Sequence, residues 1–326
     1  MHDLTSTTVS SPPQPALVTL ADVDAAAERI VGRVLRTPLL TVQNGLWLKP
    51  ESLQPTGAFK LRGATNAVLQ LSEEQRKRGV LTHSSGNHGQ ALAYAASLAG
   101  VACTVVMPHG AAAVKVASTR RYGAHVDLVE EADRIARVEE LAAASGAEVI
   151  PPYDDARIIA GQGTVGREIV ADLPDVGTVL VPSGGGGLVS GVAVAVKALA
   201  PSVRVVAVEP ELAGDLADGF ARGEHAVWSP ELTTRTMAGG LHSSTVGALN
   251  WAHIRTLVDD VVTVTEDEIV GAVRFLATTG RLVAEPSGAV ATARWLRDPS
   301  AYGSAPVVSV VSGGNVDEDL LRRLLR

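Results

Sequence analysis

The chain has 326 residues, which is enough for one large domain or two ordinary domains with a substantial core. Hydrophobic residues make up 46% of the chain and aromatic residues only 3%, so the core must consist mainly of aliphatic side chains and alanine. The formal net charge is −7, and no basic patch is interleaved with aromatic residues. These features argue against a nucleic-acid-binding protein.

The N-terminus is rich in Ser, Thr and Pro and lacks the basic start and apolar core of a signal peptide, so we predict a disordered tail at residues 1–18. Residues 84–114 contain no charged side chain, but glycines and a proline interrupt them, so we predict no membrane span. The lone Cys103 excludes an internal disulfide and indicates a reducing compartment, for which we predict the cytoplasm.

Apolar strand candidates alternate with alanine-rich helical stretches along the chain. We predict strands at residues 80–82, 102–107, 126–129, 178–181, 203–208 and 307–311. We predict helices at residues 22–34, 63–71, 91–98, 134–144, 163–173, 188–200 and 266–278. Nearly continuous apolar strands between helices predict parallel sheets covered on both faces, and hence an α/β fold.

The segment around Lys60 combines a lysine with apolar neighbours, Phe59 and Leu61, between two glycines that predict a turn leading into a helix. Such neighbours disfavour the ammonium form and leave a nucleophilic amine. An amine of this kind forms Schiff bases with aldehydes, including pyridoxal phosphate (PLP). An ordinary lysine whose charged end reaches solvent explains the same pattern, so this segment alone does not decide the matter.

Residues 84–90, Ser-Ser-Gly-Asn-His-Gly-Gln, follow a short strand and precede an alanine-rich helix. The free N–H groups and the dipole at a helix start favour an anion such as a substrate carboxylate. Helix capping with glycine punctuation is the alternative interpretation. Seven consecutive small or capping residues exceed what a cap needs, so we predict a binding loop.

Residues 183–188, Ser-Gly-Gly-Gly-Gly-Leu, lie directly between a predicted strand and a predicted helix. Four glycines allow successive main-chain N–H groups to face one concavity, which suits a phosphate. The segment lacks the Gly-Lys-Ser/Thr ending of a nucleotide P-loop, and it does not match the dinucleotide pattern G-x-G-x-x-G. We therefore predict a phosphate cradle of another kind.

Together these three segments resemble the fold-type II PLP enzymes, most closely the serine/threonine dehydratase and serine racemase family. The resemblance runs from about residue 37 to residue 317, with further matches at residues 160–164, 208–210, 262–268, 285–288 and 312–317. It implies an α/β fold of the tryptophan synthase β type, with two domains that each contain a mostly parallel sheet flanked by helices. We expect a large PLP-binding domain at residues 19–78 and 156–326 and a small substrate-side domain at residues 79–155.

The resemblance implies a role for each cofactor-binding residue. Lys60 would bind the PLP aldehyde and later remove the Cα proton of the substrate, while Phe59 would stack near the ring. Asn87 would hydrogen-bond the phenolic oxygen, and Gly240 would lie beside the cofactor. Ser312 would face the pyridine nitrogen. The phosphate would lie on the main-chain N–H groups of Gly184, Gly185, Gly186, Gly187 and Leu188.

The resemblance also implies which side chains lie near the substrate carboxylate, namely Ser84, Asn87, His88 and Ser243. For His88, a structural place at the helix start is equally compatible. In serine racemase the serine that matches Ser85 lies opposite the lysine and exchanges a proton there, so racemisation is chemically feasible. A neutral hydroxyl at Ser312 keeps the electron sink weak, which favours loss of a β-substituent over transamination.

Residues 209–215 resemble the divalent-cation site of this family. Glu209 and Asp215 would supply carboxylates, Ala213 its carbonyl oxygen, and waters would complete an octahedron suited to Mg²⁺, with Ca²⁺ or Mn²⁺ as alternatives. A solvated acidic turn is the other interpretation. Residues 239–242, Gly-Gly-Leu-His, depart from the family pattern, and Ala58 replaces a common serine; both differences bear on substrate choice.

These observations predict a PLP-dependent ammonia-lyase that removes water from L-threonine or L-serine to give a 2-oxo acid and ammonia. Serine racemase and threo-3-hydroxyaspartate dehydratase are the alternatives within the family, and a cysteine-synthase-type enzyme fits the loop at residues 84–90 less well. A nicotinamide-dependent oxidoreductase, with Glu209 on a ribose hydroxyl, leaves Lys60 unexplained. We expect a homodimer with a small amino-acid substrate and no nucleic-acid or membrane partner.

Overall fold

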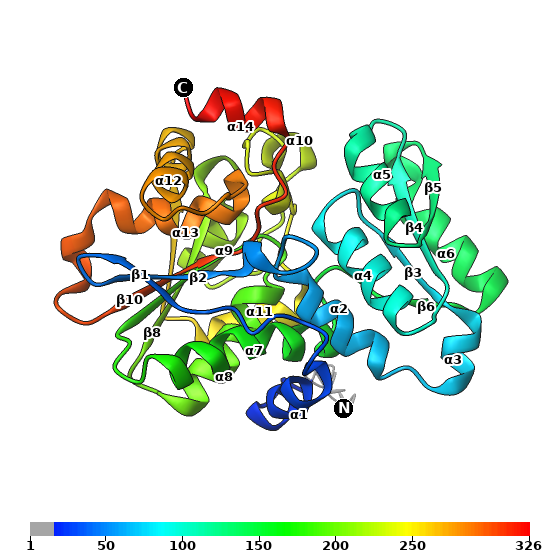
Figure 1. Ribbon diagram of the computed structural model, residues 1–326, viewed down its shortest axis with the longest axis horizontal. Helices are drawn as coiled ribbons and strands as arrows, with labels where there is room; N and C mark the ends of the chain where they lie inside the picture. The colour runs from blue at the N-terminus through cyan, green and yellow to red at the C-terminus, as the bar shows by residue number, and fades with distance from the viewer. Residues whose placement is uncertain (1–15) are drawn as a thin grey trace, which may run out of the picture.

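The computed structural model describes residues 16–326, which form two α/β regions side by side (Figure 1). The larger region contains a six-stranded sheet of order β1-β2-β10-β7-β8-β9, and the smaller one a four-stranded sheet of order β5-β4-β3-β6. All neighbouring strands run parallel apart from β1 and β2. The structure therefore has the predicted α/β architecture with two mostly parallel sheets.

The six strands of the large sheet come from distant parts of the chain. They are β1 (Leu40–Gln43), β2 (Leu46–Pro50), β7 (Thr178–Pro182), β8 (Arg204–Pro210), β9 (Asp260–Val264) and β10 (Val307–Val311). The small sheet comes from one continuous stretch. Its strands are β3 (Val80–His83), β4 (Cys103–Pro108), β5 (His125–Val129) and β6 (Glu148–Val149).

Helices flank both sheets. In the N-terminal half they are α1 (Leu20–Ile30), α2 (Lys60–Leu69), α3 (Glu73–Arg78), α4 (Asn87–Leu98), α5 (Ala113–Arg121), α6 (Arg134–Ser145) and α7 (Ala156–Asp172). In the C-terminal half they are α8 (Gly187–Leu199), α9 (Asp215–Arg222), α10 (Pro230–Thr233), α11 (Ala248–Leu257), α12 (Glu266–Thr278), α13 (Pro286–Arg297) and α14 (Glu318–Leu324).

Both faces of the large sheet are apolar, because successive residues of its central strands enter different cores. In β7, Leu180 packs with α12 and α13, whereas Val179 and Val181 pack with α7 and α8. The same alternation holds in β8 and β10. The two helix layers lie on opposite sides of the sheet (Figure 1). This arrangement explains why the strands are nearly continuous apolar runs.

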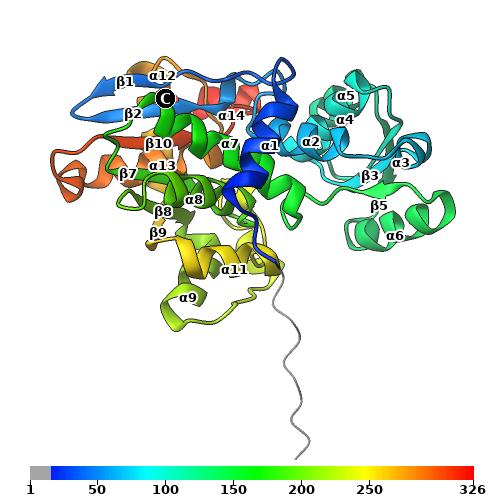
Figure 2. The same cartoon turned by 90° about the horizontal axis from the view of Figure 1, so that it is seen from below.

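Glycines allow α7 to pack closely against α2 and α8. A Cβ on Gly161 would lie 2.6 Å from the Cα of Gly63, and one on Gly191 would lie 2.3 Å from the carbonyl oxygen of Ile159. Because α2 also packs on α4, it joins the two regions of the molecule (Figure 2). The lysine at the start of α2 therefore lies at their junction.

The observed elements agree with most predicted ones and differ from some. The helix predicted at residues 163–173 begins at Ala156, since its early glycines serve close packing and do not end the helix. The hairpin β1–β2, strand β9 and helices α11 and α13 were not predicted. Of the predicted tail, residues 1–15 lie outside the described residues, whereas Val18 is buried and its N–H donates to His253 Nε2 at 2.8 Å.

Within residues 16–326, no helix has both the length and the apolar character needed to cross a bilayer. The apolar residues 84–114 instead form α4 and β4 with connecting loops, as the glycine and proline interruptions predicted.

Candidate active site

The turn before Lys60 is fastened to the segment that follows β10. The N–H of Phe59 donates to the carbonyl oxygen of Ser312 at 3.0 Å, and the N–H of Gly314 donates to the carbonyl oxygen of Gly57 at 2.9 Å. Gly57 has a φ of +73°, a backbone conformation that glycine adopts without strain. The main chain thus holds two motifs from opposite ends of the sequence against each other.

Lys60 is the first residue of α2, and the groups around its amine carry no negative charge that could pair with an ammonium ion. Its Nζ donates to the carbonyl oxygen of Pro152 at 2.5 Å and lies 5.2 Å from the ring centroid of Phe59 and 6.0 Å from that of Tyr153. No carboxylate pairs with it among the described residues. Loss of hydration lowers the pKa of Lys60 to about 8, as the apolar neighbours predicted.

A buried cluster of ion pairs holds the first turn of α2 in place. Arg62 is fully buried and pairs with Glu51 at 2.7 Å and with Glu168 at 2.7 Å, while Lys49 donates to Glu168 at 2.6 Å. Two cations and two anions balance in this cluster, so no charge is left uncompensated. The cluster links β2, α2 and α7 through Arg62, which lies two residues after Lys60. The sequence pattern gave no indication of this cluster.

The glycine loop at residues 184–187 leads from β7 into α8. Gly186 has a φ of +89° and caps the helix. Among the hydrogen bonds of residues 16–326, none uses the N–H groups of residues 184–188 as donors. The buried hydroxyl of Ser183 also lacks a partner there. A row of unpaired donors at a helix start fits the phosphate of PLP.

Tyr153 covers this loop, and the sequence analysis did not identify it. A Cβ on Gly185 would lie 2.2 Å from the Tyr153 ring, so the glycine makes this contact possible. Burial raises the pKa of Tyr153, while the nearby Ser243 side chain acts in the opposite direction. The signal in the sequence was the run Pro152-Tyr153-Asp154-Asp155, in which two acids precede a helix. Asp155 caps α7, and Asp154 accepts the first N–H groups of α11.

Ser312 and Gly240 both meet Ser287 at the start of α13. The Ser312 hydroxyl is buried and donates to the Ser287 carbonyl oxygen at 3.5 Å, and a Cβ on Gly240 would lie 2.7 Å from the Ser287 hydroxyl. The neighbouring Leu241 packs against the loop, since a Cβ on Gly184 would lie 3.0 Å from its Cα. The structure therefore brings Gly240 and Ser312, two of the predicted cofactor residues, into contact with the same residue, Ser287.

Ser84 and His88 begin the smaller region's part of the site. The Ser84 hydroxyl accepts the N–H of Gly86 at 3.2 Å within its own loop. The Nε2 of His88 lies 2.9 Å from the Ile150 carbonyl oxygen, which only accepts, so Nε2 carries the proton. Burial lowers the pKa of His88 to about 3, with the charge of Lys60 adding to the effect. A carboxylate at this helix start would therefore interact with main-chain N–H groups and not with a charged imidazole.

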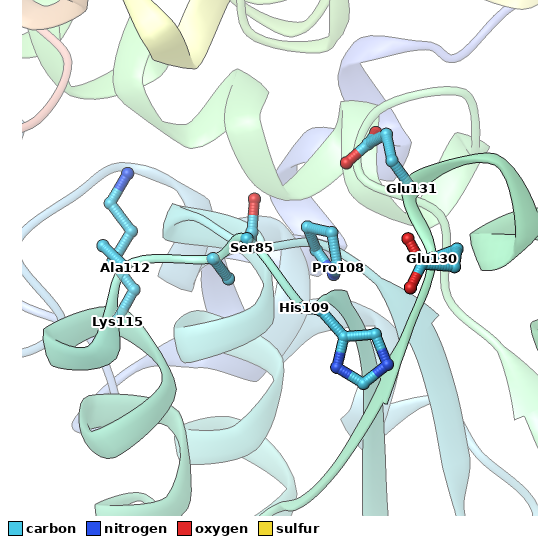
Figure 3. Close-up of a pocket in the computed structure, with 9 residues that line it drawn as sticks. Ser85, Pro108, His109, Ala112, Lys115, Glu130 and Glu131 are labelled. Carbon is cyan, nitrogen blue, oxygen red and sulfur yellow. The ribbon is translucent and has the colours of Figure 1, made fainter.

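Ser85 lines a pocket of about 380 Å³ on the small-sheet side of the site (Figure 3). Its hydroxyl lies between the side chains of Lys115 and Glu131, which flank the pocket (Figure 3). Lys60 and the glycine loop do not line this pocket.

The predicted metal ligands form a buried acidic pair. Glu209 is the residue before the last of β8 and Asp215 begins α9, and one oxygen of each lacks a partner among the described residues. Burial raises the pKa of Glu209 well above its ordinary value and that of Asp215 to about 7. Two such oxygens fit a divalent cation, with Ala213 buried in the turn between them. Within residues 16–326 no three His, Cys, Asp or Glu side chains gather, so an ion here would also need carbonyl oxygens and water.

Comparison with known proteins identifies the family. The family described as pyridoxal-phosphate dependent enzyme matches residues 30–313. The chain belongs to this family. Its cofactor is therefore PLP, in agreement with the free donors of the glycine loop and the desolvated amine of Lys60.

Relatives within the family carry several related activities. The chain is 40% identical to the catabolic L-threonine dehydratase of Escherichia coli K12 over 92% of this chain and 94% of the relative. It is 40% identical to L-threo-3-hydroxyaspartate ammonia-lyase of Saccharomyces cerevisiae over 92% and 94%, respectively. The solved structure of maize serine racemase is 38% identical, with a TM-score of 0.89 over 94% of this chain and 97% of that one. The predicted family, fold and cofactor are confirmed, and the residue roles stay predictions.

Proposed function

We propose that this PLP enzyme removes water from a small β-hydroxy amino acid, L-threonine or L-serine, and releases a 2-oxo acid and ammonia. The observation that carries the proposal is the desolvated amine of Lys60 beside the covered glycine loop. The relatives named L-threonine dehydratase and L-threo-3-hydroxyaspartate ammonia-lyase support the reaction class. They also keep the hydroxy diacid as an alternative substrate.

The residues divide the work in a definite way. Bound PLP supplies an electron sink for the pair left at Cα when a proton is removed. Lys60 would take that proton, because a pKa of about 8 leaves a much larger neutral fraction near neutral pH than an ordinary lysine has, and only the neutral amine can accept a proton. Phe59 and Tyr153 flank the amine and keep water from it. Asn87 would hold the phenolic oxygen of the cofactor and Ser312 its pyridine nitrogen.

The carboxylate of the substrate would bind at the start of α4. There the main-chain N–H groups after Gly86 lack helical acceptors, and the dipole of a 12-residue helix favours an anion. The hydroxyl groups of Ser84 and Ser243 would add donors. A neutral His88 adds no charge, so the main chain carries most of this interaction.

Ser312 bears on the outcome of the reaction. Its hydroxyl is uncharged, whereas a carboxylate at the pyridine nitrogen would keep that nitrogen protonated and strengthen the sink. With the neutral Ser312 at that nitrogen the cofactor would supply a weaker electron sink, which favours loss of the β-hydroxyl over transfer of the amino group.

Ser85 makes racemisation the second candidate function, because the matching serine of serine racemase lies opposite the lysine. A proton delivered by Ser85 to the face opposite Lys60 would invert the substrate. The test is incubation of L-serine in D₂O with the enzyme and with its Ser85→Ala variant. We expect deuterated D-serine from the parent alone; its absence from both would exclude this activity.

We also propose domain boundaries, a cellular location and an oligomeric state for the enzyme. The large domain would comprise residues 19–78 and 156–326, and the small domain residues 79–155, which contain the whole four-stranded sheet. A cytoplasmic location is consistent with the lone Cys103, which is buried and forms no disulfide. A homodimer rests on family resemblance, and light scattering tests it.

A substrate screen tests the main proposal. Release of 2-oxo acid is measured for L-threonine, L-serine, their D-enantiomers and L-threo-3-hydroxyaspartate. We expect the L-β-hydroxy amino acids to react and Lys60→Ala to lose at least about 10²–10⁴-fold of the rate, the usual contribution of a general base. Lys77→Ala, a change at an exposed lysine, is the matched control. A Lys60→Ala variant with the parent rate would overturn the assignment.

A further inference from the structure

The Asn87 amide is held at both ends by residues to which no role has yet been given. Its Nδ2 donates to Glu285 Oε1 at 2.6 Å, and its Oδ1 accepts from Asn315 Nδ2 at 2.8 Å. Asn87 begins α4 on the small-sheet side, whereas Glu285 caps α13 and Asn315 follows β10 on the large-sheet side. These hydrogen bonds therefore connect the two regions at the site.

The partners determine which way each amide faces. Asn315 Nδ2 also donates to the carbonyl oxygen of Thr56 at 2.8 Å, and a carbonyl oxygen can only accept. Both N–H groups of Asn315 are then used, and the second must meet the oxygen of Asn87. The nitrogen of Asn87 consequently faces Glu285 and retains one unused N–H. The orientation follows from the hydrogen bonds and not from an arbitrary choice of amide flip.

Two glycines leave space for this arrangement. A Cβ on Gly313 would lie 2.2 Å from Glu285 Oε1, and a Cβ on Gly57 would lie 2.3 Å from Asn315 Oδ1. Burial raises the pKa of Glu285 to about 7, while Asn87, the charge of Lys115 and Ser287 act in the opposite direction. At a pKa of about 7 the carboxyl group is partly ionised near neutral pH, and its ionised form can only accept from Asn87.

We propose that Glu285 and Asn315 are positioning residues that fix the Asn87 amide with a single free N–H for the phenolic oxygen of PLP. The inference rests on the proposed cofactor-binding role of Asn87. An ionised phenolic oxygen requires a donor, and an amide turned by half a rotation would present its carbonyl oxygen and repel it. Glu285 and Asn315 act through Asn87 and need not touch the cofactor.

The experiment compares PLP binding by variants of the full chain. Asn315→Leu removes both donors, Glu285→Met removes the acceptor, and Glu285→Gln keeps an acceptor without the charge. We expect the first two to raise the PLP dissociation constant about tenfold or more, as for loss of a hydrogen bond to a charged group, and to shift the visible band of bound PLP. Glu285→Gln should restore the constant to within about threefold of the parent.

Controls separate this effect from general destabilisation. Asn66→Leu removes a buried amide whose Nδ2 donates to the Arg157 carbonyl oxygen at 2.6 Å and which shares no hydrogen bond with Asn87, Asn315 or Glu285, so it should leave the band unchanged. Circular dichroism verifies folding, and Asn315→Ala replaces Asn315→Leu if the latter does not fold. In a double-mutant cycle, Asn87→Ala combined with the Asn315 change should cost less than the sum of the two single effects.

The possible failures are distinguishable. If Asn87→Ala weakens PLP binding but the Asn315 and Glu285→Met variants bind with the parent constant and band, the positioning role is wrong. If Asn87→Ala also matches the parent while PLP still attaches to Lys60, the cofactor-binding role of Asn87 is wrong, and the inference falls with it. If no PLP attaches to Lys60, the proposed function itself fails.

Discussion

The amine of Lys60 should titrate far below an ordinary lysine, and the structure sets the size of the effect. The Nζ has only the Pro152 carbonyl oxygen and two aromatic rings around it, so loss of hydration lowers its pKa from 10.5 to about 8. At pH 7 about 9% of the amine would be neutral, compared with about 0.03% at a pKa of 10.5. The nucleophilic form is therefore about 300 times more abundant.

Labelling of the PLP-free enzyme measures this directly. Formaldehyde and a reductant methylate only neutral amines, and mass spectrometry of the digest follows the Lys60 peptide from pH 6 to pH 11. Because burial disfavours the charged form, the labelling rate should rise with pH, reach half its maximum near pH 8 and level off above about pH 9. The exposed Lys77 in the same digest controls for reagent concentration. A rate that still climbs steeply between pH 9 and pH 10 would refute the desolvation argument.

Two further predictions concern packing and the acidic pair. Gly191→Ala should lower the free energy of unfolding by about 1–3 kcal/mol, because its Cβ would lie 2.3 Å from a carbonyl oxygen. The control Gly271→Ala on α12 places a Cβ with nothing within 4 Å, so it should raise the free energy of unfolding by up to about 1 kcal/mol. Denaturant titration compares the two variants. Mg²⁺ at 100 times its dissociation constant should stabilise the fold by about 2.7 kcal/mol, measured by thermal unfolding. Asp215→Asn should abolish that gain, and an equal gain in Glu209→Gln and the parent would remove the ion from this site.

The sequence predicted the central strands and the site motifs because each depends on local chemistry. Strands such as β7 are continuous apolar runs, and the glycine loop needs its composition for the main chain to approach a ligand. The hairpin β1–β2 was missed although Asn44 and Gly45, both with positive φ, form a recognisable turn signal. Its strands are short and only partly apolar, so the periodicity was weak.

Other features depend on long-range contacts that no local pattern reveals. The early glycines of α7 looked like helix breakers, but they let α7 approach α2 and α8. Tyr153 became a site residue only when folding brought it against Gly185. The partner of His88 is the main-chain carbonyl of Ile150, which has no signature in the sequence. The motifs of the candidate site can therefore be recognised in the sequence, whereas the hydrogen bonds that orient their side chains cannot.

The central claim is that PLP attaches to the amine of Lys60. Borohydride reduction of the PLP-bound enzyme, digestion and mass spectrometry locate the attachment directly. We predict a single pyridoxyl adduct on the Lys60 peptide, and none in the Lys60→Ala variant. An adduct on another lysine, or a yellow enzyme with no adduct at Lys60, would contradict the account.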